Sequence, residues 1–212
     1  GVPDDRYDDV VATLKHEISV KYDNHLNTGI FGTQFFFETL ALNGLNDIAY
    51  NAMNQEDFPS FGNWIKQGAT VTWEKWNGAD SRNHPMFGGG LTWFYRILAG
   101  VNVDAERPAY EHIIIKPILD KRLPEVYYSH MTPYGEVVSE IRQTGRNLEM
   151  NVTVPVGSTA TIYIPVGGNT SEVTESGISV RDSKDVRFER IQDGNCIVRV
   201  PQGKYKFKVD NQ

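Results

Sequence analysis

The stretch from Asn147 to Val166, NLEMNVTVPVGSTATIYIPV, decides the fold class of the second half of the chain. Apolar and polar residues alternate through its two runs, which are separated by the turn sequence VGST. A period of two places one side of each run on a buried face, and turn residues between such runs indicate antiparallel strands. The same alternation returns in KYKFKV, residues 204–209. The sequence therefore predicts an antiparallel β-sandwich over residues 106–212.

In the first half of the chain, apolar residues recur at helical spacing. Val10, Leu14 and Ile18 step by four, and the acidic start DDRYDD suits the positive end of a helix dipole. Further helices are predicted for QFFFETLAL, which ends before Gly44, and for LNDIAYNAMN and GGLTWFYRILAG. These helices are too few to cover their many aromatic residues. Either they pack heavily on the sandwich or residues 1–105 end a larger helical domain, and we favour the second interpretation.

The composition of the chain argues against several classes of function. Its 212 residues carry a formal net charge of -6, which argues against nucleic acid as a partner. No apolar run reaches the roughly 18–20 residues that span a bilayer, so no membrane partner is expected. Cys196 is the single cysteine, and its place in NCIVRV predicts a small buried hydrophobe. The histidines lack partners at metal-ligand spacing, so we predict no metal site and no cofactor.

Two features concern processing rather than the fold. The opening GVPDDRYDDV has no methionine and no features of a signal peptide, and we interpret it as a processed or truncated end. NVT at Asn151 and NTS at Asn169 match the N-glycosylation pattern, which is common by chance. Neither feature decides the function.

The segment TVTWEKWNG places Glu74 between Trp73 and Trp76. Flat aromatic faces beside a carboxylate suit a sugar, whose C–H face stacks on a ring while its hydroxyls take hydrogen bonds. A carboxylate among indoles is partly desolvated, which raises its pKa and makes it a stronger base. Ten residues on, RNHPMFGG offers Asn83 and His84 as donors to hydroxyls. These residue types predict the rim of a sugar pocket.

The same residues fit a purely structural alternative. Glu74 can pair with Lys75 or Arg82, the tryptophans can be core, and His84 can cap the helix that follows. Residue types alone leave both interpretations open.

Several motifs in fixed order resemble the C-terminal part of the bacterial α-L-rhamnosidases of glycoside hydrolase family 78. The resemblance covers residues 2–166, and the last strands fit by pattern only. The runs that carry it are HLNTGIFGTQFFFETLALNGLNDIAYNAMNQEDFPSFGNWIKQGATVTWEKWNG (25–78), NHPMFGGGLTWFYRILAGV (83–101), YEHIIIKP (110–117), TPYGEVVSEI (132–141) and VTVPVGSTATIYIP (152–165).

The resemblance implies an (α/α)6 barrel followed by a β-sandwich. Residues 1–105 would then be the last helices of the barrel domain and residues 106–212 the C-terminal sandwich. It also implies cleavage of terminal α-L-rhamnose from glycosides with inversion, using two carboxylates. The expected partner is thus a rhamnose-containing glycoside or polysaccharide, together with the remainder of the barrel domain upstream.

The resemblance also assigns roles to individual residues. Glu74 occupies the place of the general base in the family's Trp-Glu-Arg-Trp-like motif, with Lys75 in place of the commoner arginine. His84 matches the histidine of the Asn-His motif that contacts the sugar, and Trp73 and Trp76 are expected pocket walls. The family's general acid lies upstream of these residues, so we expect this chain alone to be inactive.

Two alternative functions remain open from the sequence. One is another inverting (α/α)-barrel glycosidase acting on glucosides or other hexosides. The other is a non-catalytic carbohydrate-binding module that acts through the sandwich. The sandwich lacks a tryptophan cluster of the kind such modules often use, and holds only tyrosines.

Overall fold

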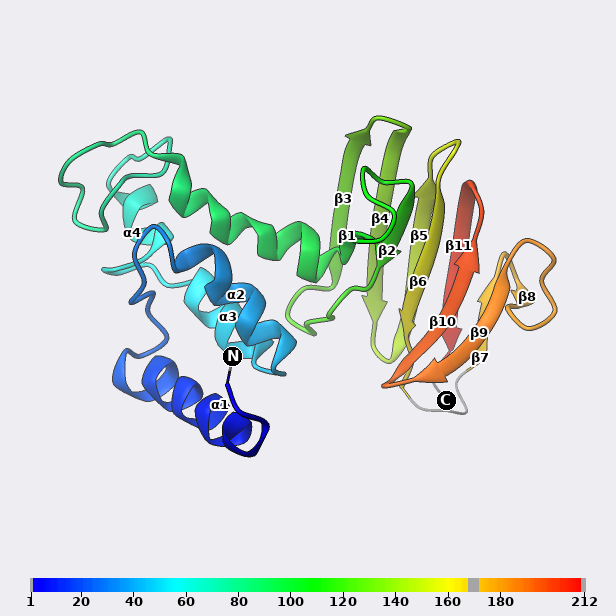
Figure 1. Cartoon of the computed structure of the whole chain (residues 1–212), viewed down its shortest axis with the longest axis horizontal. Helices are drawn as coiled ribbons and strands as arrows, with labels where there is room; N and C mark the ends of the chain where they lie inside the picture. Colours follow the sequence, from blue (N-terminus) through cyan, green and yellow to red (C-terminus); the bar gives the residue numbers. More distant parts are fainter. Residues whose placement is uncertain (1, 168–171, 211–212) are drawn as a thin grey trace. The chain divides into compact units, whose positions relative to one another are not determined.

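Figure 1 shows a computed structural model of the protein, which describes residues 2–167 and 172–210. The chain divides into two compact units, Gly1–Trp93 and Phe94–Gln212. The first unit is built from helices and the second mainly from strands, which confirms the predicted order of helices followed by a sandwich. Of the two glycosylation patterns, the one at Asn169 lies outside the described residues.

The first unit is a succession of short helices joined by turns. None of the described helices has the length and hydropathy to cross a membrane. In chain order the helices are η1 (Asp4–Arg6), α1 (Tyr7–His16), η2 (Glu17–Lys21), α2 (Thr33–Leu42), α3 (Asn46–Met53), α4 (Phe61–Lys66), η3 (Pro85–Leu91) and η4 (Trp93–Leu98). The division between the units falls within η4. The sequence predicts a domain boundary after residue 105, and that boundary stays a proposal.

The helices α2 and α3 match two of the predicted helices and form a hairpin. Gly44 ends α2 with a φ of +73°, a backbone conformation that favours glycine. Phe37 and Leu40 lie on the buried side of α2, and the Phe37 ring packs 6.0 Å from the ring of Trp93. The indole N–H of Trp93 donates to Asn46 Oδ1 at 2.8 Å, which ties the start of α3 to this core.

The predicted helix GGLTWFYRILAG differs from the expectation in its winding. The helix η3 begins at Pro85, before the predicted start at Gly89, and has tight 3₁₀ turns, whereas η4 has wide π turns. Three consecutive glycines weaken an α-helix. Gly89 also lies against α2, where an added Cβ would come within 2.5 Å of Gln34 Cβ. Close packing on α2 therefore overrides regular helical winding.

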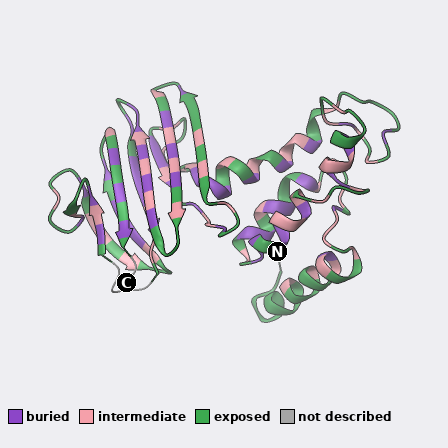
Figure 2. Ribbon diagram, turned by 180° about the vertical axis from the view of Figure 1, so that it is seen from behind, coloured by how far each residue is buried: buried purple, intermediate pink, exposed green. Residues whose placement is uncertain are grey.

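The helix α1 is amphipathic but has no buried residue. Val10, on its predicted apolar side, is 43% exposed. Figure 2 shows α1 almost entirely in the colour of exposed residues. Phe35 and Leu42 of α2 are also exposed. Apolar surface of this extent normally marks an interaction face, which agrees with the interpretation of a larger helical domain.

The second unit is a sandwich of two sheets. Within the described residues, one sheet has the order β1 (Val101–Val103), β2 (His112–Ile115), β6 (Thr159–Pro165), β10 (Asn195–Val200), β9 (Arg187–Gln192). The other has the order β3 (Glu125–Thr132), β4 (Gly135–Thr144), β5 (Asn147–Val154), β11 (Gly203–Asp210), β7 (Glu172–Glu175), β8 (Ile178–Ser179).

The strands pair antiparallel, as predicted, except that β2 and β6 run parallel with Ile113 opposite Ala160. A parallel pair needs a long crossover connection. Here the chain passes through β3, β4 and β5 of the other sheet between β2 and β6. The parallel pair therefore follows from the crossing between sheets, which strand periodicity does not reveal.

The alternation in the sequence matches the burial of the strands. Met150 of β5 and Ile162 of β6 are fully buried in the core between the sheets. Cys196 of β10 belongs to the same core, which confirms its interpretation as a small buried hydrophobe. Burial raises the pKa of the Cys196 thiol to about 11, so the reactive thiolate is disfavoured in the folded chain.

A buried histidine is expected to make the stability of the sandwich depend on pH. His112 of β2 is 3% exposed, and its ring nitrogens lie 2.6 Å from Thr159 Oγ1 and 2.8 Å from Thr161 Oγ1. Burial, followed by the charge of Arg107, lowers the pKa of His112. A histidine whose pKa is lowered by folding contributes its full stabilisation above its pKa in the unfolded chain, about 6.5. This stabilisation is lost as the pH falls through the lower pKa of the folded chain.

We therefore expect the free energy of unfolding to decrease on acidification from about pH 7 to about pH 5, partly through His112. Urea denaturation followed by circular dichroism measures this dependence. In a His112→Gln variant, which cannot bind the proton, the dependence on pH should be weaker. Identical pH dependence in the two proteins would contradict the assignment.

Candidate active site

The candidate site lies in the connection between α4 and η3, residues 72–84. Two backbone hydrogen bonds of 2.8 Å tie its two limbs together, from Glu74 N to Ser81 O and from His84 N to Thr72 O. The Thr72 hydroxyl adds a third by donating to His84 O at 2.6 Å. The segment is thus an irregular hairpin that brings Glu74 and His84 onto facing limbs, although ten positions separate them in the sequence.

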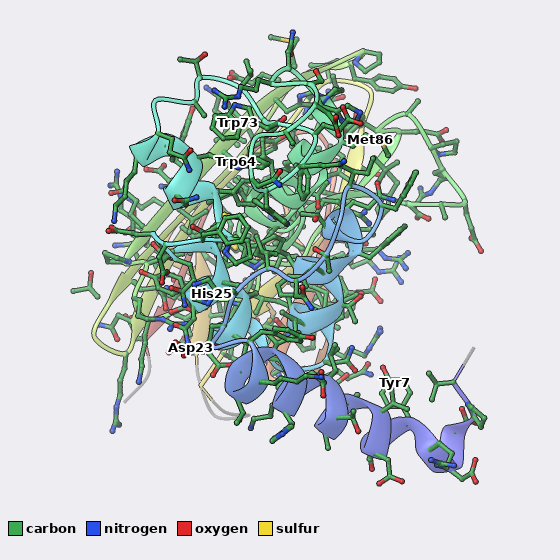
Figure 3. The ribbon with its side chains drawn as sticks, turned by 90° about the vertical axis from the view of Figure 1, so that its left-hand side faces the viewer. Tyr7, Asp23, His25, Trp64, Trp73 and Met86 are labelled. Carbon is green, nitrogen blue, oxygen red and sulfur yellow. The ribbon has the colours of Figure 1, made fainter. Side chains whose placement is uncertain are left out.

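An aromatic cluster supports this hairpin. Trp64 of α4, Trp73 and Phe87 are buried together, and Trp76 packs against them with 4.5 Å between the Trp64 and Trp76 ring centroids. Figure 3 shows Trp64 next to Trp73. The indole N–H of Trp64 donates to Trp76 O, and that of Trp76 donates to Thr28 O, both at 2.8 Å. The cluster therefore fixes the hairpin to α4 and to the loop at Thr28.

The ring of Trp73 is enclosed by its own hairpin. Gly78 turns the chain with a φ of +72°, and a Cβ there would lie 2.8 Å from the Trp73 ring. The Arg82 guanidinium carbon lies 4.7 Å from the Trp73 ring centroid, and Arg82 Nε donates to Gly78 O at 3.1 Å. Trp73 is only 4% exposed. In this structure it supports the hairpin, and its role as a pocket wall stays a prediction.

Glu74 is half-buried and is held by the opposite limb. The Ser81 N–H donates to Glu74 Oε2 at 3.1 Å. Lys75 Nζ instead pairs with Asp80 Oδ2 at 2.5 Å. Among the described residues, Glu74 forms no ion pair with either Lys75 or Arg82, so the pairing suggested by the structural alternative is not observed. The Oε1 atom accepts no hydrogen bond from the described part of the chain and is open to a water.

The aromatic residues favour the structural alternative in part. Trp73 is core, as that alternative expects, whereas Trp76 is only partly buried at the edge of the cluster.

His84 stands directly before η3 but forms no side-chain capping hydrogen bond. The Nδ1 atom of His84 is buried without a hydrogen-bond partner in the described structure. Such an atom costs free energy unless a partner satisfies it, so His84 is suited to bind a further group.

Asn83 lies beside His84 on an exposed part of the hairpin. Its backbone is bound to the Ser81 hydroxyl, which accepts from Asn83 N at 3.2 Å and donates to Asn83 O at 3.1 Å. The Asn83 side chain is thus presented from an ordered backbone. Ser81 itself was not selected from the sequence, because its two contacts to the limb of Glu74 exist only in the folded hairpin.

Two sequence profiles of known protein families match the chain. The bacterial alpha-L-rhamnosidase 6 hairpin glycosidase domain matches residues 2–98, and the bacterial alpha-L-rhamnosidase C-terminal domain matches residues 100–179. An alpha-L-rhamnosidase of Formosa agariphila is 30% identical over 198 residues, covering 88% of this chain and 21% of its own length. A second one from the same organism is 26% identical over 213 residues, covering 97% of this chain and 22% of its own length.

Solved structures give the same result. The alpha-L-rhamnosidase from Dictyoglumus thermophilum is 34% identical with a TM-score of 0.88, covering 99% of this chain and 24% of that protein. The alpha-L-rhamnosidase of Streptomyces avermitilis, solved in complex with L-rhamnose, is 27% identical with a TM-score of 0.86. The match covers 99% of this chain and 20% of that protein. The chain spans about a fifth to a quarter of these relatives. It belongs to the bacterial α-L-rhamnosidase family and corresponds to a C-terminal portion of its members, with the last helices of the barrel and the sandwich that follows.

Proposed function

We propose that this chain is part of an inverting α-L-rhamnosidase and carries its general base, Glu74. The observation that carries the proposal is the state of the Glu74 carboxylate. Ser81 N–H holds Oε2, no described cation pairs with the group, and Oε1 is open to a water. Family membership supports rhamnosides rather than glucosides as the substrate class, because the relatives that match are rhamnosidases.

In the proposed reaction, Glu74 takes a proton from a water that attacks the anomeric carbon. The glycosidic bond breaks as the new carbon–oxygen bond forms, and a general acid protonates the leaving oxygen. In inverting glycosidases the two carboxyl groups stand roughly 6.5–9.5 Å apart, which leaves room for the water between base and sugar. His84 and Asn83 would hydrogen-bond to sugar hydroxyls, and Trp76 would form part of the pocket wall.

The general acid is proposed to come from barrel helices upstream of this chain. Another carboxylate of the same hairpin, Asp80, is paired with Lys75. General acid catalysis typically contributes about 10²–10⁴-fold to the rate. The exposed apolar side of α1 and the exposed Phe35 and Leu42 would pack against the same upstream helices.

The isolated chain is therefore expected to release aryl alcohol from an aryl α-L-rhamnoside no faster than buffer. The same result is expected for its Glu74→Gln variant. Absorbance of the released alcohol measures both rates. Robust turnover by the chain that disappears in the variant would place a working acid within these 212 residues and would refute the proposed origin of the acid.

A further inference from the structure

The candidate hairpin of residues 72–84 is held across its limbs in two places. Glu74 N donates to Ser81 O, and His84 N donates to Thr72 O, both at 2.8 Å. In each place a side chain of the first limb makes a second contact. The Glu74 carboxylate accepts from Ser81 N at 3.1 Å, and the Thr72 hydroxyl donates to His84 O at 2.6 Å. Each pair of facing residues is thus joined twice.

The two limbs contribute unequal numbers of residues between these contacts. Trp73 alone separates them on the first limb, whereas Arg82 and Asn83 separate them on the second. Two residues opposite one are the arrangement of a β-bulge, which re-aims side chains and is frequent next to active sites. A shift of one residue turns a side chain to the other face of an extended chain. Without the extra residue, Asn83 would therefore take the place of His84 opposite Thr72.

The extra residue sets His84 on the same side of the hairpin as Glu74. Neighbouring side chains of an extended chain point to opposite faces, so Glu74 and Thr72 point away from the side of the buried Trp73 ring. Residues directly opposite each other share a face, so His84 shares the face of Thr72. Arg82 lies on the other face, since its guanidinium carbon is 4.7 Å from the Trp73 ring centroid.

The Ser81 hydroxyl closes the backbone around the extra residue. It accepts from Asn83 N at 3.2 Å and donates to Asn83 O at 3.1 Å. Both backbone polar groups of Asn83 are thereby bound within their own limb, which holds this residue out of the pairing between the limbs. The backbone N–H of Ser81 meanwhile binds Glu74 Oε2. One residue therefore contacts both the carboxylate and the extra residue.

We propose that Ser81 is a positioning residue, whose hydroxyl keeps His84 beside Glu74 by holding Asn83 out of the pairing. This inference rests on the proposed function, in which Glu74 is the base and His84 binds the sugar. Alanine at position 81 still supplies the backbone N–H that binds Glu74 and removes only the contacts to Asn83. Loss of the hydroxyl should therefore impair sugar binding and leave the base in its present state.

Amide hydrogen exchange of the ¹⁵N-labelled full chain tests the geometry without catalysis. In Ser81→Ala, the amide of His84, which donates to Thr72 O, should exchange at least about tenfold faster. The amide of Glu74, which donates to Ser81 O, should change by no more than about twofold. Ser81→Thr keeps the hydroxyl and should exchange as the original chain does at both positions. Equal acceleration of both amides in Ser81→Ala, or of neither, would overturn the proposal.

Steady-state kinetics of the longer rhamnosidase of which we propose this chain to be a part tests the consequence for binding. Ser81→Ala should raise KM for an aryl α-L-rhamnoside by about five- to tenfold, the effect of a lost hydrogen bond, and keep kcat within about threefold. Ser81→Thr should return KM to within about twofold of the original value. A purely structural defect would instead lower the amount of active enzyme, and with it the apparent kcat, at constant KM.

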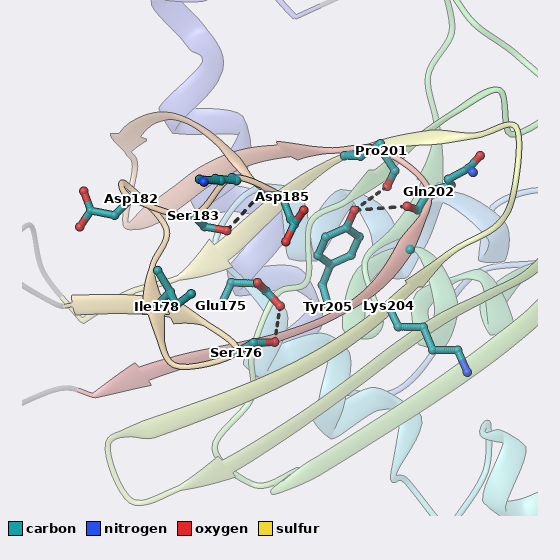
Figure 4. Close-up of a pocket in the computed structure, with 12 residues that line it drawn as sticks. Glu175, Ser176, Ile178, Asp182, Ser183, Asp185, Pro201, Gln202, Lys204 and Tyr205 are labelled. Carbon is teal, nitrogen blue, oxygen red and sulfur yellow. Dashed lines mark hydrogen bonds between the residues drawn. The ribbon is translucent and has the colours of Figure 1, made fainter.

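Ser183→Ala is the matched control. Ser183 belongs to a loop of the second unit, where its hydroxyl accepts from Asp185 N at 3.3 Å (Figure 4). The same substitution there removes a similar turn contact and should leave KM and the His84 amide unchanged. An unchanged KM in Ser81→Ala, together with a low kcat in Glu74→Gln, would overturn this inference alone. An unchanged kcat in Glu74→Gln would overturn the proposed function, and this inference with it.

Discussion

In the longer rhamnosidase of which we propose this chain to be a part, Glu74→Gln is expected to lower kcat for an aryl α-L-rhamnoside by about 10²–10⁴-fold, the usual contribution of a general base. Glutamine has the same shape, and its carbonyl can still accept from Ser81 N–H. It cannot take a proton from the attacking water. The loss should therefore fall on kcat, with KM changed by no more than about threefold, because substrate binding is preserved.

Lys75→Arg is the matched control for this variant. It changes the neighbouring position to the residue that is commoner in the family motif and keeps the charge that pairs with Asp80. The exposed ion pair contributes little, so kcat should stay within about twofold of the starting value. Steady-state kinetics on the three proteins, at equal concentration and confirmed folding, gives the comparison. A Glu74→Gln enzyme with nearly full kcat would remove Glu74 from the chemistry.

The second large effect concerns stability. Trp64→Ala is expected to lower the free energy of unfolding of the first unit by about 3–5 kcal/mol, the range for truncation of a buried aromatic residue. Trp64 packs against Trp73, Trp76 and Phe87, and its N–H holds the backbone of the candidate hairpin. Loss of the ring leaves a cavity and an unpaired carbonyl at Trp76.

Ile65→Ala is the control, because Ile65 follows Trp64 in the same helix but is 71% exposed. Its effect on the free energy of unfolding should be about 0.5 kcal/mol or less. Urea denaturation of the chain, followed by the fluorescence of the remaining tryptophans, measures both variants. Equal destabilisation by the two substitutions would show that the cluster does not hold this unit together.

Periodicity predicted the elements of the fold better than their geometry. The strand at residues 147–154 and the helix pair around Gly44 follow directly from apolar spacing and turn residues. The winding of η3 and η4 does not, because it depends on how closely Gly89 approaches α2. The parallel pairing of β2 with β6 also depends on the path of the chain between sheets, which a local pattern does not contain.

For the candidate site, residue types singled out Glu74 and its aromatic neighbours as candidates but did not give their arrangement. From the sequence, Trp73 and Trp76 were both expected to be pocket walls. In the structure Trp73 is buried next to Arg82, whereas Trp76 lies at the edge of the cluster. Ser81 could not be predicted, because its contact with Glu74 uses a backbone N–H, which every residue except proline possesses. Such contacts come from the hairpin and not from a motif.

The stereochemistry of hydrolysis tests the proposed role of Glu74 most directly. A general base that activates water inverts the anomeric centre, whereas a carboxylate that acts as a nucleophile retains it. Proton NMR of the proposed longer rhamnosidase during the first minutes of hydrolysis identifies the anomer that forms before mutarotation. We predict β-L-rhamnose as the first product of an α-L-rhamnoside. Initial formation of α-L-rhamnose would contradict the assignment of Glu74 as a general base.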